Sequence, residues 1–206
     1  MSLLKFVKRF FFKKNKGISN GVIDENIPVV FIDRYETRVI PDIPSYIFEE
    51  SELLISKLRK SEDDPFLSLR LIYDFLDVFS KFASTFTVCS KGCSSCCKIG
   101  VNVTALEAKY IENCTGHKVN INKKRKAKTN KSCPFLISDS CSIYEYRPFN
   151  CRTFFTADDP KYCKTPNEPH QVYGMNGGEK IPVVHQYRKY VDRLNKKNVG
   201  DIRTFF

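Results

Sequence analysis

The chain has 206 residues, is 42% hydrophobic and 28% charged, and carries nine cysteines and a formal net charge of +11. This composition excludes a disordered tail, which has few apolar residues, and a polytopic membrane protein, which needs long uncharged apolar runs. A chain of this length can build a core without disulfides, so the cysteines require another explanation.

Residues 1–17 contain six basic and no acidic residues, and their apolar residues recur at helical spacing. The segment therefore has the pattern of a basic amphipathic helix, which either packs on its own domain or lies on an anionic membrane surface. Lysine and arginine interrupt every apolar run, so we expect no export signal. The sequence predicts a cytoplasmic protein, with peripheral membrane contact as the alternative and no transmembrane span.

Residues 18–85 are predicted to form a helical layer with one short strand. The strand is expected at residues 29–32, where β-branched and aromatic residues lie between a proline and an aspartate. A first helix is expected from Ser45 to Lys60. Asp64 followed by Pro65 predicts the start of a second, longer helix that ends near Phe82, and its apolar face is wide enough to require central packing.

Residues 86–165 contain most of the cysteines, and Thr104 with Glu107 three residues later predicts a capped helix that ends near Asn113. Residues 166–206 are predicted to pack back on the domain through a last helix at 183–195. The expected fold class is mainly α, with irregular, metal-organised loops and a few short strands, that is, α+β with small β content.

Eight of the cysteines fall into groups. In a reducing compartment, clustered cysteines bind metal more often than they form disulfides. Thiols three or four residues apart on a turn can meet at one point, as zinc or an iron–sulfur cluster requires. The candidate metal ligands are Cys89, Cys93, Cys96, Cys97, Cys133, Cys141, Cys151 and Cys163.

Adjacent Cys96 and Cys97 cannot easily point the same way. The pair suggests either two metal centres or one ligand beside a packing or redox thiol. Cys114 stands apart from the groups and is interpreted as a packing residue. The three histidines are dispersed and are interpreted as surface or structural residues, His170 being the best candidate ligand among them.

Several motifs occur in an order that resembles a known family. They are CxxxCxxCC, SCPFL, CSIYEYRPFNCR and a trailing cysteine, within about residues 86–165. In this order they resemble the YkgJ-type cysteine-cluster proteins, a zinc- or iron-chelating domain. The resemblance implies that the eight grouped cysteines are the metal ligands and that the metal is zinc or an iron–sulfur cluster. One branch, the flagellin lysine methylases, joins this kind of cluster to methyl transfer.

Arg147 and Arg152 flank Cys151. A metal held by thiolates is anionic overall, so its burial needs hydrogen-bond donors and positive charge nearby. We expect one or both arginines to donate to thiolate sulfurs or to backbone carbonyls around the site. The alternative is a set of ordinary surface salt bridges with Glu145, Asp158 or Asp159.

The leading hypothesis is a metal-binding cysteine-cluster protein whose eight thiolates hold an iron–sulfur cluster or two metal ions. A second hypothesis is a structural-zinc binding module that contacts nucleic acid or an anionic membrane through residues 1–17 and a basic insertion at 118–131. A third is a redox or methyl-transfer enzyme with an open metal site. The sequence assigns no catalytic residue.

Overall fold

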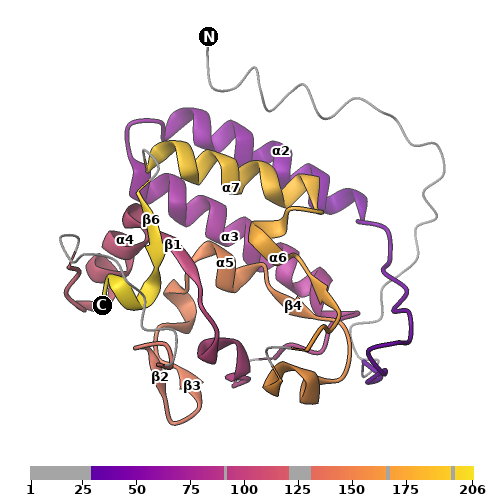
Figure 1. Cartoon of the computed structure of the whole chain (residues 1–206). Helices are drawn as coiled ribbons and strands as arrows, with labels where there is room; N and C mark the ends of the chain where they lie inside the picture. The colour runs from indigo at the N-terminus through magenta and orange to yellow at the C-terminus, as the bar shows by residue number, and fades with distance from the viewer. Residues whose placement is uncertain (1–28, 91, 121–130, 166–167, 196–197) are drawn as a thin grey trace.

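The computed structural model describes residues 29–90, 92–120, 131–165, 168–195 and 198–206. The predicted helix at 1–17 and most of the basic insertion at 118–131 lie outside the described residues. Within them, helices dominate and the strands form short antiparallel pairs (Figure 1). The predicted fold class, mainly α with small β content, is confirmed.

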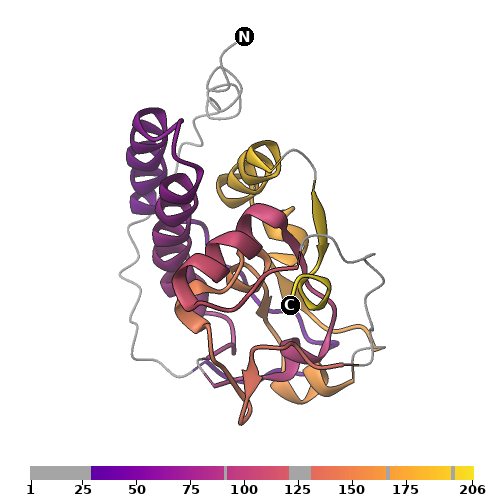
Figure 2. The same cartoon turned by 90° about the vertical axis from the view of Figure 1, so that its left-hand side faces the viewer.

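Three long helices form one side of the molecule. They are α2 (Ser45–Lys60), α3 (Pro65–Ser84) and α7 (Pro182–Leu194), and both α2 and α7 pack on α3 (Figures 1 and 2). The Asp64 carboxylate accepts the backbone N–H groups of Phe66 and Leu67, so this residue caps α3 as predicted. The predicted ends of these helices are confirmed to within one or two residues.

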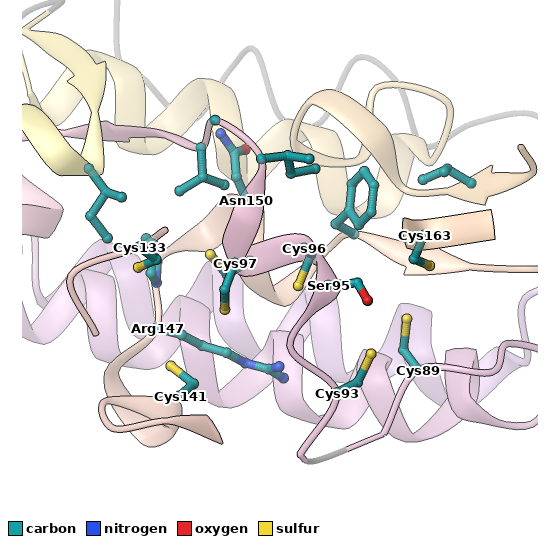
Figure 3. Close-up of a pocket in the computed structure, with 18 of the residues that line it drawn as sticks. Cys89, Cys93, Ser95, Cys96, Cys97, Cys133, Cys141, Arg147, Asn150 and Cys163 are labelled. Carbon is teal, nitrogen blue, oxygen red and sulfur yellow. The ribbon is translucent and has the colours of Figure 1, made fainter. Parts of the chain in front are cut away.

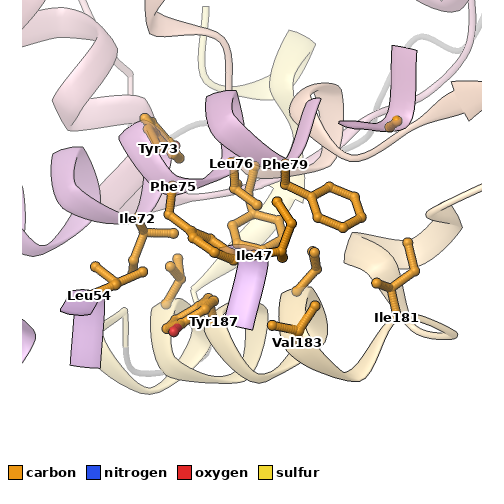
Figure 4. Packing of buried hydrophobic residues seen from close by; sticks show 14 of the residues in the cluster. Ile47, Leu54, Ile72, Tyr73, Phe75, Leu76, Phe79, Ile181, Val183 and Tyr187 are labelled. Atoms are coloured by element: carbon orange, nitrogen blue, oxygen red, sulfur yellow. The ribbon is translucent and has the colours of Figure 1, made fainter. Parts of the chain in front are cut away.

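The main core lies between these helices, where α3 buries Ile72, Leu76 and Phe79 (Figure 4). Tyr187 of α7 packs edge-on against Phe75, with the ring centroids 5.1 Å apart. The Tyr187 hydroxyl donates to the Ser51 carbonyl at 3.0 Å. This bond satisfies the polar end of a buried tyrosine. The same core also contains residues from the cysteine-bearing segments, such as Phe149 and Phe155. The predicted division of the chain at residue 85 stays a prediction.

The strand expected at residues 29–32 is wrong. Residues 29–43 instead form an irregular segment, here called the N-terminal strap, that lies along residues 157–171. The Ile32 carbonyl accepts the Asp159 N–H at 3.0 Å, and Arg38 Nε donates to the Ala157 carbonyl at 2.9 Å. Val30 and Phe31 are 71% and 60% exposed, so the strap has no buried face that would make it part of a sheet.

A second, smaller core surrounds α4 (Ala105–Thr115). The predicted capping box is confirmed, because Thr104 Oγ1 accepts the Glu107 N–H and the Glu107 carboxylate accepts the Thr104 N–H. Just before α4, β1 (Asn102–Thr104) pairs antiparallel with β6 (Val199–Asp201). The buried members of this core are Val103, Ala105, Ala108, Ile111, Phe135, Ile143, Ile202 and Phe205.

The remaining elements are short and lie on the side away from α2 (Figure 1). They are η1 (Ser95–Lys98), β2 (Leu136–Ile137), β3 (Ser140–Cys141), η2 (Tyr144–Tyr146), α5 (Phe149–Arg152), β4 (Phe155–Thr156), η3 (Pro160–Lys164), β5 (Val172–Tyr173), α6 (Met175–Gly178) and η4 (Ile202–Thr204). None of the helices in the described ranges combines the length and the apolar character that a membrane span needs.

Candidate metal centre

A cavity of about 750 Å³ opens among these short elements (Figure 3). All eight of the grouped cysteines line it, whereas Cys114 is not among its lining residues. The sequence-predicted ligand candidates, which span 75 residues of the chain between Cys89 and Cys163, are therefore brought to one place.

Four segments of the chain supply these cysteines. The first runs from residue 89 into η1, and α5 and η3 carry Cys151 and Cys163. The fourth is the β2–β3 hairpin, whose two-residue turn has positive φ at Ser138 (48°) and Asp139 (56°). Such a turn matches the twist of a tight hairpin. It places Cys141 opposite Leu136, and Leu136 lies three residues after Cys133 in the chain.

Cys89, Cys93 and Cys163 lie together at one end of the cavity and are called the first thiol group (Figure 3). Thr156 of β4 connects two of them. Its backbone N–H donates to Cys89 Sγ at 3.1 Å, and its hydroxyl lies 3.1 Å from Cys163 Sγ. Donors to sulfur stabilise the thiolate form, so Thr156 belongs to the polar surroundings that a bound metal would need.

Cys97, Cys133, Cys141 and Cys151 lie toward the other end and are called the second thiol group. The Cys133 N–H donates to the Cys97 carbonyl at 2.7 Å, which fixes the hairpin against η1. Cys96 lies between the groups, since its sulfur is near enough to act on the ionisation of both Cys163 and Cys151. The adjacent cysteines are thus divided, with Cys97 in one group and Cys96 between the two.

Burial disfavours the thiolate and is the largest cause of the raised pKa of five of these thiols: Cys89, Cys133, Cys141, Cys151 and Cys163. It raises the pKa of Cys89 to about 11 and holds the pKa of Cys151 well above its ordinary value. Cys96 and Cys97 differ, because the hydrogen bond between their thiols raises the pKa of Cys97 and, together with the charge of Arg147, lowers the pKa of Cys96 to about 7. A bound cation would favour the thiolate at every one of these positions.

Arg147 lines the cavity (Figure 3). Its charge helps to lower the pKa of Cys96 and opposes the rise that burial causes in the pKa of Cys141. The guanidinium carbon lies 4.1 Å above the Tyr144 ring, and the buried Nε has no hydrogen-bond partner among the described residues. A positive charge with an unused donor therefore stands beside the sulfurs, where an anionic thiolate centre would need it.

Arg152 is 2% exposed and lies over the Tyr73 ring of α3, 4.4 Å from the guanidinium carbon to the ring centroid. Its Nε donates to the Arg147 carbonyl at 2.8 Å, a second nitrogen donates to the Glu145 carbonyl, and the third contacts the Asp77 carboxylate. Neither Asp158 nor Asp159 is its partner within the described ranges, where their ion pairs are with His170 and Lys161. Arg152 thus holds the backbone within η2 and at its C-terminal end, and it anchors α5 to α3.

The residue types present fit a zinc or iron site, because thiolates are the preferred ligands of structural zinc and of iron–sulfur clusters. Across the described part of the chain, no three Cys, His, Asp or Glu side chains already lie in a metal-binding arrangement. The sulfurs therefore have to draw together around a metal, and the cavity that they line gives them room to do so.

Some contributors to the site carried no signal in the sequence. Thr156 is one, and Arg203 is another: its guanidinium donates to the carbonyls of Cys97 (3.2 Å) and Ile99 (2.7 Å) and so fixes the end of η1. Each contacts a residue more than 60 positions away in the sequence, and no local motif reveals such a contact.

A cavity lined by eight cysteine thiols and a guanidinium offers the donor types of a thiolate metal site. Residues 88–170 match the family CxxCxxCC, described as "Putative zinc- or iron-chelating domain". This match over residues 88–170 confirms the resemblance that the motifs predicted. No curated protein and no solved structure matches the chain.

Proposed function

We propose that the eight cavity cysteines hold two metal centres of zinc or iron, one at each end of the cavity. The observation that carries this proposal is the shared lining of one cavity by all eight cysteines, seven of them in a first and a second thiol group and Cys96 between the groups. A single iron–sulfur cluster is the alternative occupant. Four thiolates complete either a tetrahedral zinc or a cluster, so eight are twice the requirement of one centre.

The charges of the site support this proposal. Zinc with four thiolates carries a formal charge of −2, and its burial needs compensation. Arg147 supplies a positive charge beside Cys96, between the groups, and beside Cys141 of the second group. Arg203 adds another near Cys133, whose pKa is raised by burial, and the charge of Arg203 opposes that rise.

The metal is proposed to organise the loops that carry the cysteines. Those segments have only short elements, whereas structural zinc contributes on the order of 10–16 kcal/mol of binding free energy in small peptides. Four thiolates at each centre would leave no coordination position for a substrate. We therefore favour a structural metal over the redox or methyl-transfer enzyme, which would need an open position.

Anaerobic purification of the full chain, followed by elemental analysis and a visible spectrum, tests the proposal. Two zinc ions per chain in a colourless protein, or about twice the iron of one cluster in a brown one, would support two centres. Cys133→Ser and Cys163→Ser should each reduce the bound metal, and Cys114→Ser, outside the cavity, should not. A full metal content in both cavity variants would contradict the proposal.

Contact with an anionic partner is a second proposal, supported by the charge of the sequence. Residues 1–17 and the 118–131 insertion are rich in lysine and arginine. Binding to anionic vesicles or to nucleic acid should then weaken steeply with salt, and neutralising the lysines at 123–126 should weaken it further. We also propose a cytoplasmic location, with these segments as the means of any contact with the membrane periphery, because a reducing compartment keeps free thiols available as ligands.

A further inference from the structure

The β4–β5 hairpin carries two residues that line the first end of the cavity. Its strands pair Phe155 with Tyr173, and the Ala157 N–H donates to the Gln171 carbonyl at 2.9 Å. Between them the loop presents Cys163 of the first thiol group and His170, and both line the cavity. The first thiol group has three members, one fewer than a tetrahedral metal requires.

His170 is held by a buried carboxylate. Its Nδ1 lies 3.3 Å from Asp158 Oδ1, and the Asp158 side chain is fully buried. The other carboxylate oxygen accepts the Gln171 N–H at 2.7 Å, which fixes the orientation of the carboxylate. His170 is the only ion-pair partner of Asp158 among the described residues, with no lysine or arginine beside it.

We propose that His170 is a metal ligand, binding through Nε2 at the end of the cavity that contains Cys89, Cys93 and Cys163. The inference rests on the proposed metal binding and adds a nitrogen donor to a set of thiolates. Three cysteines and one histidine are a common ligand set for zinc. His170 thus takes the fourth position that Cys96 would otherwise fill in the proposed two-centre arrangement, and Cys96 lies between two complete sets of four donors.

The carboxylate beside Nδ1 supports this role. Histidines that bind metals through one ring nitrogen usually donate the other N–H to a carboxylate or carbonyl, which fixes the ring and increases its basicity. A buried carboxylate that faces only an imidazole and one amide N–H is costly unless the imidazole carries positive charge or binds a cation. A metal on Nε2 supplies that cation without requiring His170 to be protonated.

The N-terminal strap holds this loop in place. Arg34 lies over the Tyr162 ring at 3.9 Å and pairs with Glu168, and Gln171 donates to the Arg34 carbonyl at 3.0 Å. These contacts lie on both sides of Cys163 and His170, so the two side chains are presented from a supported loop.

Cobalt replacement in the full chain tests the inference, because the absorption of Co²⁺ depends on the number of sulfur and nitrogen ligands. Metal-free protein is titrated anaerobically with Co²⁺ and compared with His170→Ala, His170→Cys and Asp158→Asn. His185→Ala is the matched control, since His185 is also half-buried but is not among the cavity-lining residues.

His170→Ala should shift the d–d bands of one Co²⁺ and weaken its binding, and Asp158→Asn should weaken the same site about 10- to 100-fold. His170→Cys should keep the binding and increase the thiolate-to-cobalt charge transfer by one sulfur, a change that a purely structural histidine would not produce. His185→Ala should match the unmodified protein.

Three results would overturn the inference. If His170→Ala and His170→Cys give the spectrum and affinity of the unmodified protein, His170 is not a ligand, although the metal-binding proposal survives. If all the histidine variants weaken cobalt equally, the effect is one of stability and not of ligation. If the unmodified chain takes up no Co²⁺, Zn²⁺ or iron, the proposed function fails as well.

Discussion

Glu107, in the first turn of α4, accepts a hydrogen bond from the backbone N–H of Phe149 at 2.8 Å. The same carboxylate accepts the Tyr73 hydroxyl at 3.1 Å and lies 3.6 Å from an Arg188 nitrogen. A fully buried side chain thus joins α3, α4, α5 and α7. Because α5 carries Cys151, this carboxylate connects the helical core to the wall of the metal cavity.

Replacing Glu107 should destabilise the whole protein. Glu107→Gln puts an amide nitrogen where one oxygen now accepts two donors from Thr104, and it removes the charge opposite Arg188. Loss of one partner of a buried charged network costs about 3–5 kcal/mol, to be measured as the free energy of unfolding in urea. Glu112→Gln on the same helix, whose pair with Lys118 is exposed, should cost less than about 1 kcal/mol. Equal losses would contradict this account.

Arg152 and Asp77 should contribute unequally although they form one ion pair. The Arg152 side chain is 3% exposed and also serves two carbonyls, whereas the Asp77 side chain is 52% exposed. Arg152→Met should cost on the order of 2–5 kcal/mol, because the carbonyls lose their donor. Asp77→Asn should cost less than about 1 kcal/mol. Thermal and urea unfolding of both variants check this difference, and the reverse order would disprove the assigned role.

Removal of the metal should affect the two sides of the molecule differently. Chelation should open the segments from residue 86 to 165, whereas much of α3 stays folded because its apolar residues pack on α2 and α7. Hydrogen exchange with and without chelator measures this, with α3 as the internal reference. Unchanged protection and unchanged thiol reactivity after complete chelation would show that the metal does not organise these segments.

The strap should loosen in acid. The Tyr162 hydroxyl and the Tyr35 N–H donate to the Asp33 carboxylate and lower its pKa below the ordinary value of 3.8. Because the folded pKa is the lower one, Asp33 stabilises the fold above pH 3.8, and this contribution is lost as the pH falls through the folded pKa. The stability difference between the unmodified protein and Asp33→Asn should therefore be constant near neutral pH and shrink below pH 3.8.

Tyr162→Phe provides the control for this prediction. It removes the main donor to Asp33, so Asp33→Asn should have a smaller effect in that background. A stability difference that grows on acidification would contradict the assignment.

The sequence predicted the helices well because their signals are local. Asp64 with Pro65 and the Thr104–Glu107 box specify helix starts within four residues, and both are observed. It failed at residues 29–32, since a strand exists only when a partner strand pairs with it, and the strap's contacts are single hydrogen bonds to a loop more than 100 residues away.

The sequence predicted which cysteines belong to the candidate site but not how they are arranged in space. The grouping of eight cysteines is visible in the sequence, and the cavity collects those eight. Their division into two thiol groups depends on how the hairpin, α5 and η3 pack, and periodicity does not reveal this packing. The role of Asp158 was missed for the same reason: its partner His170 lies across a hairpin, whereas the sequence offered an arginine as partner only in the alternative interpretation.

The pairing of β1 with β6 has a consequence for biosynthesis. Arg203, just past β6, holds the carbonyls of Cys97 and Ile99, so the loop with the first cysteines is fixed by residues made about a hundred positions later. Until residues 199–203 have been synthesised, the backbone at Cys97 and Ile99 lacks this support, so the end of η1 takes its final position only after translation has reached the last strand.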